Sequence, residues 1–222
     1  MKPSVKTLPN YSKRDEIINS ITHLVGFLFG LGVLIFFIIF SLSKNLKFSY
    51  MIPYYVYAFS IMVVFGVSTM YHSSKLKSKC KAILRVIDHS DIYFLIFGTY
   101  LPLCLYAIGN HTVATIALIL ESVFMVAGIV LNVIPIDSKI MKIIAYIIYI
   151  IDGWLILFFY PFNIGMDFNV FLFILLGGVI YTIGAILYAI GKKKIYFHSI
   201  FHVFVLLGAA TQFVGIYFLL TM

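Results

Sequence analysis

Residues 197–220 read FHSIFHVFVLLGAATQFVGIYFLL, and this stretch decides the fold. It contains no charged residue, and as a helix it is about 36 Å long, enough to cross a hydrocarbon core of about 30 Å. Two histidines, His198 and His202, stand near its start, and their i,i+4 spacing places both on one helix face. Polar side chains in a membrane helix are costly and usually functional. The stretch therefore predicts both a membrane span and a site.

The composition of the whole chain is that of a membrane protein. Of its 222 residues, 63% are hydrophobic and the mean hydropathy is +1.08, whereas soluble domains are about 45–50% apolar. The alternation of apolar runs and polar loops predicts an all-α integral membrane protein, a seven-transmembrane helix bundle. Residues 1–19 form a cytoplasmic N-terminal segment, and residues 20–222 a single transmembrane domain. The seven spans are expected at residues 20–42, 50–72, 88–108, 112–135, 140–161, 168–190 and 197–220.

The distribution of lysine and arginine indicates the direction of the chain. All but two of the 16 basic residues lie in the N-terminal tail and in the regions that follow the second, fourth and sixth spans. The exceptions are Lys44 and Lys47. Under the positive-inside rule the N-terminus is cytoplasmic and the C-terminus outside. Because the net charge of +8 is spread over separate loops, the expected partners are anionic lipids and not nucleic acid. We expect a multi-pass protein of the cell (plasma) membrane.

Four polar residues should meet at the cytoplasmic face. His72 ends the second span, Asp88 opens the third, and His198 and His202 open the seventh. Three imidazoles would leave one position of a tetrahedral zinc site open, as in catalytic zinc sites. The alternatives are that His198 and His202 lie near headgroups or form a hydrogen-bonded packing pair, that His72 caps the end of its helix, and that Asp88 caps the N-terminus of its helix.

Other polar residues surround this expected site. Ser68 lies one helical turn before His72, although a serine in a membrane helix more often bonds its own backbone. A stripe at i, i+3 and i+7 enters the first span and continues into two glycines that permit close helix packing; its alternative is the solvated face of a lead-in helix. The stripe consists of Glu16, Asn19 and His23, followed by Gly26 and Gly30. Two further candidates near Asp88 are His89 and Asp91.

Two acids, Glu121 and Asp152, stand inside the fourth and fifth spans. We expect each to be an isolated, protonated carboxyl bonded to a neighbouring helix. A proton-relay or substrate role is the weaker hypothesis.

These motifs, in this order along an apolar chain, resemble the haemolysin III family, the bacterial branch of the progestin and adipoQ receptor (PAQR) proteins. The wider superfamily includes the alkaline ceramidases. The resemblance covers essentially the whole chain and includes the stretch DHSDIYFLIFGTYLP at residues 88–102. It implies a seven-helix membrane fold with a zinc ion near the cytoplasmic side. The matching positions are His72, His198 and His202 as zinc ligands, Asp88 near a bound water, and Ser68 in support. Asp91 departs from the small neutral residue expected there.

The expected function is the zinc-dependent hydrolysis of a lipid acyl bond, an amide or an ester, ceramidase-like by resemblance. Membrane lipids are then the possible substrates and Zn²⁺ the cofactor. Zinc lowers the pKa of bound water towards about 7, and Asp88 could accept the proton and later donate it to the leaving group. The alternative is a non-enzymatic protein, either a sensor or regulator of membrane lipid homeostasis or a cytolysin. Transport ranks third and would rest on the two acids inside the spans.

Overall fold

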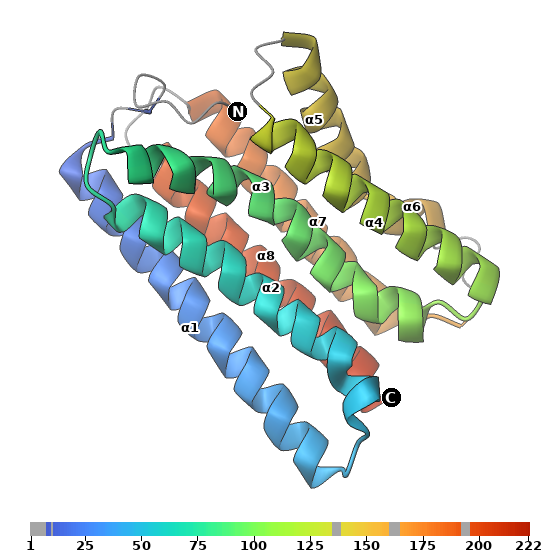
Figure 1. The fold of residues 1–222 in the computed structure, drawn as a ribbon. Coiled ribbons are helices and arrows are strands. Elements are labelled where there is room, and N and C mark those ends of the chain that lie inside the picture. Colours follow the sequence, from blue (N-terminus) through green and yellow to red (C-terminus); the bar gives the residue numbers. More distant parts are fainter. Residues whose placement is uncertain (1–7, 10, 135–138, 160–164, 192–195) are drawn as a thin grey trace.

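The computed structural model describes residues 8–9, 11–134, 139–159, 165–191 and 196–222. Within these ranges the chain is helical, with short connections and no strand (Figure 1). The elements are α1 (Lys13–Ser43), α2 (Phe48–Ser73), α3 (Lys79–Pro102), the π-helical turn η2 (Leu103–Ala107), α4 (His111–Val133), α5 (Lys139–Gly153), α6 (Leu155–Phe159), α7 (Phe168–Gly191) and α8 (Phe197–Thr221).

Six of these helices are long and apolar enough to cross a membrane: α1, α2, α3 with η2, α4, α7 and α8. The chain is therefore an all-α integral membrane protein with several spans. The fifth expected span consists of two pieces in the described residues, because the helix is interrupted at Trp154. The amide of Trp154 donates to the carbonyls of both Ile150 and Ile151, at 3.2 Å each. With 15 residues, α5 is about 22 Å long, shorter than a hydrocarbon core.

The third expected span begins earlier than the sequence suggested. Ser78 is the N-cap of α3, and its hydroxyl accepts a hydrogen bond from the amide of Lys81 at 3.0 Å. Asp88 consequently lies about two and a half turns inside the helix. The alternative in which Asp88 caps this helix is wrong.

The helices pack so that α2 lies between α1 and α3, while α8 pairs with α7 and also contacts α1 and α3 (Figure 1). The close approach of α1 to α2 depends on Gly26 and Gly30. A Cβ atom at Gly26 would collide with the ring of Phe65, and one at Gly30 would lie 2.8 Å from Ile61. This is the packing role expected of the two glycines.

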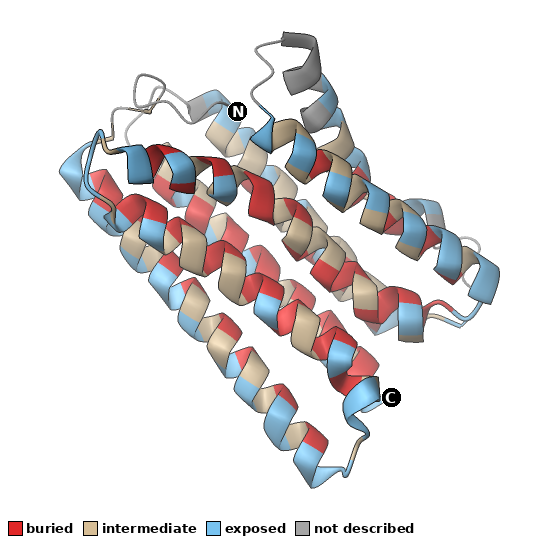
Figure 2. Cartoon of the chain, viewed as in Figure 1, coloured by how far each residue is buried: buried red, intermediate tan, exposed pale blue. Residues whose placement is uncertain are grey.

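Buried residues gather on the helix faces that point into the bundle, and the outer faces of α1 and α4 are largely exposed (Figure 2). The exposed positions carry large apolar side chains, among them Ile39, which is 62% exposed, and Val126, which is 56% exposed. Such a surface suits lipid and not water. At one end of the bundle α1, α3 and α8 begin and α2 ends, and we call this the histidine end.

Candidate metal centre

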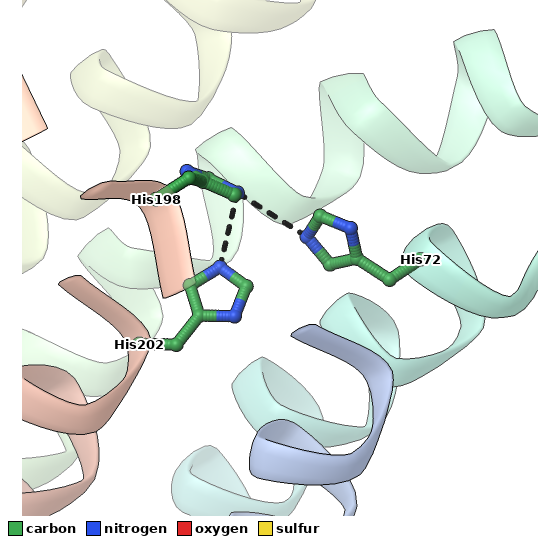
Figure 3. Close-up of side chains that lie close together, drawn as sticks. All are labelled: His72, His198 and His202. Carbon is green, nitrogen blue, oxygen red and sulfur yellow. Dashed lines mark hydrogen bonds between the residues drawn. The ribbon is translucent and has the colours of Figure 1, made fainter. Parts of the chain in front are cut away.

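Three histidine rings from two helices converge at the histidine end. The Nε2 atoms of His72 and His198 are 3.3 Å apart, and those of His198 and His202 are 3.0 Å apart (Figure 3). One ring nitrogen from each residue lies within 4.8 Å of the other two. Nitrogens bound to one tetrahedral zinc at about 2.0–2.1 Å are about 3.3 Å from each other. The spacing of the rings therefore fits a single ion of this kind.

The chemistry of the three rings favours an ion as well. His72 and His202 are 2% exposed, so water is largely excluded from the place where the nitrogens meet. A neutral imidazole has one donor and one acceptor nitrogen, so three converging Nε2 atoms cannot all be satisfied by hydrogen bonds among themselves. A shared cation would satisfy all three lone pairs.

Glu16 of α1 holds the His72 ring in place. Its Oε2 lies 2.7 Å from Nδ1 of His72, and its Oε1 lies 3.0 Å from the Nζ of Lys81. The ammonium of Lys81 also donates to the carbonyl oxygen of Tyr71 at 2.7 Å. A carboxylate on Nδ1 fixes the tautomer that leaves the Nε2 lone pair free, and it makes that nitrogen a better ligand.

The rest of the stripe on α1 also faces the histidines. The side-chain oxygen of Asn19 accepts a hydrogen bond from the hydroxyl of Ser199 at 2.5 Å, which ties α1 to α8. The ring centroid of His23 lies 3.7 Å from that of His202. Glu16, Asn19 and His23 are all buried, so the alternative of a solvated helix face is wrong.

His23 differs from its neighbours on the stripe in having no polar partner. Neither ring nitrogen makes a hydrogen bond within the described residues, although the side chain is only 4% exposed. The ring instead packs edge-on against Phe65.

Asp88 and Ser68 lie beside the histidines but outside the group that shares one coordination volume. The neighbours of the Asp88 carboxylate include Ser68, His72 and His89. Its Oδ2 is 3.5 Å from Nδ1 of His89, a ring that is 34% exposed. In the part of the chain that the structure describes, the three-residue metal-binding group contains no carboxylate. Asp88 is therefore an acid beside the candidate metal site and not part of the group that could share one ion.

Asp91 introduces a second buried carboxylate near Asp88. It is 5% exposed and its two carboxylate oxygens make no hydrogen bond within the described residues. Its charged neighbour is Asp88, one turn away on the same face of α3. Asp91 thus places a second buried acid one turn from Asp88.

Aromatic rings cover the cluster on the side of the N-terminal segment. The Tyr11 ring stacks on His198, with centroids 4.9 Å apart and planes 13° from parallel, and it lies 6.1 Å from the His72 ring. Tyr188 of α7 lies 5.3 Å from His198. Burial, and then the neighbouring Tyr188, raise the pKa of the Tyr11 hydroxyl well above its usual value. The hydroxyl is therefore a hydrogen-bond donor at neutral pH.

The position of Tyr11 follows from the start of α1. Ser12 is the N-cap of the helix and forms a capping box with Asp15: the Ser12 hydroxyl accepts from the Asp15 amide at 3.1 Å, and the Ser12 amide donates to the Asp15 carboxylate at 3.2 Å. A capping box fixes the angle at which the chain enters a helix, and here it directs the preceding residue onto His198.

Three residues of this site, Lys81, Tyr11 and Tyr188, escaped the sequence reasoning. The sequence places Lys81 among the basic residues that follow the second span, although Ser78, three residues before it, is a recognisable helix N-cap. Tyr11 directly precedes a Ser-x-x-Asp capping pattern, which was a usable signal for a packed residue. For Tyr188 the sequence gives no signal, because tyrosines are common near the ends of membrane spans.

Glu121 and Asp152 belong to another part of the bundle. Both are fully buried, and they lie close enough, on α4 and α5, to interact electrostatically. None of their carboxylate oxygens makes a hydrogen bond within the described residues. The neighbours of Glu121 include Tyr100 and Cys104. The expectation that each acid is isolated is wrong, because the packing of α5 on α4 brings the two together.

The comparisons with known proteins identify the family. Residues 11–213 match the family model described as Haemolysin-III related. The chain belongs to the haemolysin III family. A protein named Hemolysin-3 homolog from Bacillus subtilis (strain 168) is 34% identical over 209 residues, which cover 94% of this chain and 95% of the relative. Hemolysin-3 from Bacillus cereus is 32% identical over 206 residues, covering 92% and 91%. The haemolysin III match includes every residue of the candidate metal centre.

Proposed function

We propose that this haemolysin III protein is a zinc-dependent hydrolase that cleaves the acyl bond, an amide or an ester, of a membrane lipid. The observation that carries the proposal is the convergence of three Nε2 atoms at 3.0 and 3.3 Å with an unligated carboxylate beside them. Three protein ligands leave a coordination position for chemistry, whereas structural zinc sites are closed by four. Imidazole nitrogens suit zinc better than they suit magnesium or calcium.

The ligands in this proposal are His72, His198 and His202, and bound zinc would supply Lewis acidity that polarises the acyl carbonyl. Asp88 would take the proton of the attacking water and return it to the leaving amine or alcohol. Ser68, next to Asp88, would donate a hydrogen bond that orients the water or the carbonyl oxygen. Glu16 would hold His72 as a neutral ligand through its bond to Nδ1.

The proposed setting is the cytoplasmic face of the plasma membrane, with seven spans, the N-terminus inside and the C-terminus outside. Helix α4 ends and α7 begins at opposite ends of the bundle (Figure 1). The chain must cross between them, and α5 and α6 lie along that crossing, which supports a seventh span. The histidine end carries most of the basic residues, which supports a cytoplasmic location. At that depth the acyl bond of a lipid lies near the interface.

The test combines metal analysis with product release. Purified wild-type protein should contain about one zinc per chain and release fatty acid from ceramide or phospholipid in mixed micelles. His198→Ala should lose both, whereas Asp88→Asn should keep the zinc and release fatty acid about 10²–10⁴-fold more slowly. His111→Ala is the control, because His111 is the exposed first residue of α4, at the end of the bundle opposite the histidine end. Full zinc occupancy with no lipid hydrolysed would reject the enzyme.

A non-enzymatic sensor or regulator of membrane lipids is the second candidate. The Tyr11 ring stacks flat on His198 and covers one side of the cluster, which favours a metal that holds the N-terminal segment against α2 and α8. In that case zinc removal unfolds the protein while Asp88→Asn changes nothing. Lysis of erythrocytes by the wild type but not by His198→Ala would instead support a cytolysin, the activity in the names of the Bacillus relatives.

A further inference from the structure

A groove of about 470 Å³ opens beside the metal centre, between the start of α1 and the end of α2. Its inner wall includes His72 and Glu16, which are 2% and 6% exposed, and its outer walls include exposed residues of α1 and of the segment after α2. Binding sites for small molecules and cofactors commonly measure about 300–1,000 Å³. The groove is thus large enough for part of a lipid and leads sideways to a metal ligand.

The outer walls carry positive charge. Lys13 lies in the first turn of α1 and Lys75 follows the end of α2, and both are exposed residues that line the groove. Neither forms an ion pair with any residue that the structure describes. The carboxylate of Glu16 does not offset them, because it already lies 2.7 Å from His72 and 3.0 Å from Lys81. Two lysines that line one groove, one on α1 and one after α2, favour the binding of a phosphate there.

The same groove is apolar along α1. Ile17 and Ile21, one turn apart, line it and are 58% and 56% exposed. The exposed stripe continues along the helix with Leu24 at 46% and Leu28 at 55%. The ammonium groups match the phosphate of a phospholipid, and the apolar stripe beside them matches its acyl chain.

We propose that this groove binds one anionic phospholipid, with its phosphate between Lys13 and Lys75 and an acyl chain along Ile17 and Ile21. The proposal goes beyond the hydrolase, because binding requires neither the zinc nor cleavage of the lipid. It makes the negative charge of the inner leaflet a determinant of which lipid lies beside His72. A soluble phosphate lacks the acyl chain and binds far more weakly.

The experiment measures lipid binding to the delipidated full-length protein by native mass spectrometry. Phosphatidylglycerol is the anionic probe, phosphatidylcholine of the same chain length the neutral probe, and inorganic phosphate the competitor. The wild type should bind one phosphatidylglycerol in preference to phosphatidylcholine, and millimolar phosphate should not displace it. Each lysine next to an anionic headgroup contributes about fivefold, so Lys13→Gln/Lys75→Gln should lose about 30-fold in affinity for phosphatidylglycerol.

Two controls separate this site from general membrane electrostatics and from the hydrolase. Lys44→Gln/Lys47→Gln removes the same charge from exposed positions between α1 and α2 at the opposite end of the bundle, and it should bind phosphatidylglycerol like the wild type. His198→Ala removes a proposed metal ligand and should also keep the lipid. Equal losses in the two lysine pairs, equal affinities for the two lipids, or displacement by phosphate would overturn the proposal. A protein that binds phosphatidylglycerol in this way but hydrolyses nothing would reject only the enzyme.

Discussion

The carboxylate of Glu16 interacts with two buried groups, the ring of His72 and the ammonium of Lys81. Glu16→Gln should weaken zinc binding about 10–100-fold, as loss of an outer-shell carboxylate does elsewhere. It should also destabilise the protein, because Lys81, which is 1% exposed, would keep a buried charge without its counter-charge. Competition with a chelator and the unfolding midpoint measure the two effects.

The double variant Glu16→Gln/Lys81→Met separates the effect of Glu16 on zinc binding from its effect on stability. Methionine has a similar volume and removes the buried charge, so much of the lost stability should return. Zinc affinity should stay low, because nothing replaces the carboxylate at Nδ1 of His72. Full recovery of zinc affinity in the double variant would mean that Glu16 acts only as the counter-charge of Lys81.

The effect of Tyr11 on the stability of the protein is expected to depend on pH in the alkaline range. Its pKa is raised in the folded protein, mainly by burial, while in the unfolded chain it is about 10. Above about pH 10 the unfolded chain releases this proton and the folded one keeps it, so the contribution of Tyr11 to stability is complete below that pH and falls as the pH rises. Tyr11→Phe keeps the stacked ring and removes the titration. The unfolding midpoint of the variant relative to wild type should therefore rise between about pH 9 and pH 11, one unit on each side of the unfolded value. A constant difference would contradict this.

At the scale of single residues, the sequence predicted those side chains whose chemistry is rare in a membrane. Histidine and aspartate inside apolar runs are conspicuous, and the i,i+4 spacing of His198 and His202 already defines a shared face. Lys81 and Tyr188 are residue types that occur at most membrane interfaces, and only tertiary packing distinguishes them. The pairing of Glu121 with Asp152 was likewise beyond the sequence, because it depends on which helices are neighbours.

At the scale of helices, the α1–α2 contact can be tested with glycines alone. Gly26→Ala should destabilise the protein by about 1–3 kcal/mol, because the new Cβ meets the ring of Phe65, which is fully buried and has little room to move. Gly32→Ala is the matched control: no atom lies within 4 Å of its Cβ position, and alanine favours the helix. Urea unfolding in detergent measures both. Equal stabilities of the two variants would show that the close approach at Gly26 is not maintained.

Hydropathy predicted both ends of α2, α4, α7 and α8 within about two residues, because a long apolar run in a membrane has no alternative to a helix. It placed the start of α1 too late, at residue 20 instead of Lys13. It misplaced the start of α3, since Lys79, Lys81 and Arg85 lower the local hydropathy although a helix with a polar first part continues through them. It also missed the break at Trp154. Gly153 and Trp154 continue the apolar run, so hydropathy gives no sign of the interruption.

At the scale of the whole molecule, the cysteines of the chain allow its orientation in the membrane to be measured. Its two cysteines differ in access: Cys80 is exposed at the histidine end and Cys104 is buried. If the histidine end is cytoplasmic, a membrane-impermeant maleimide should leave intact cells unlabelled and label Cys80 once the membrane is permeabilised. Cys80→Ser/Lys44→Cys moves the thiol to an exposed position at the opposite end of the bundle and should be labelled in intact cells. Labelling of Cys80 from outside would reverse the direction of every span. The candidate metal centre, and the groove lined by Lys13 and Lys75, would then face the outer leaflet.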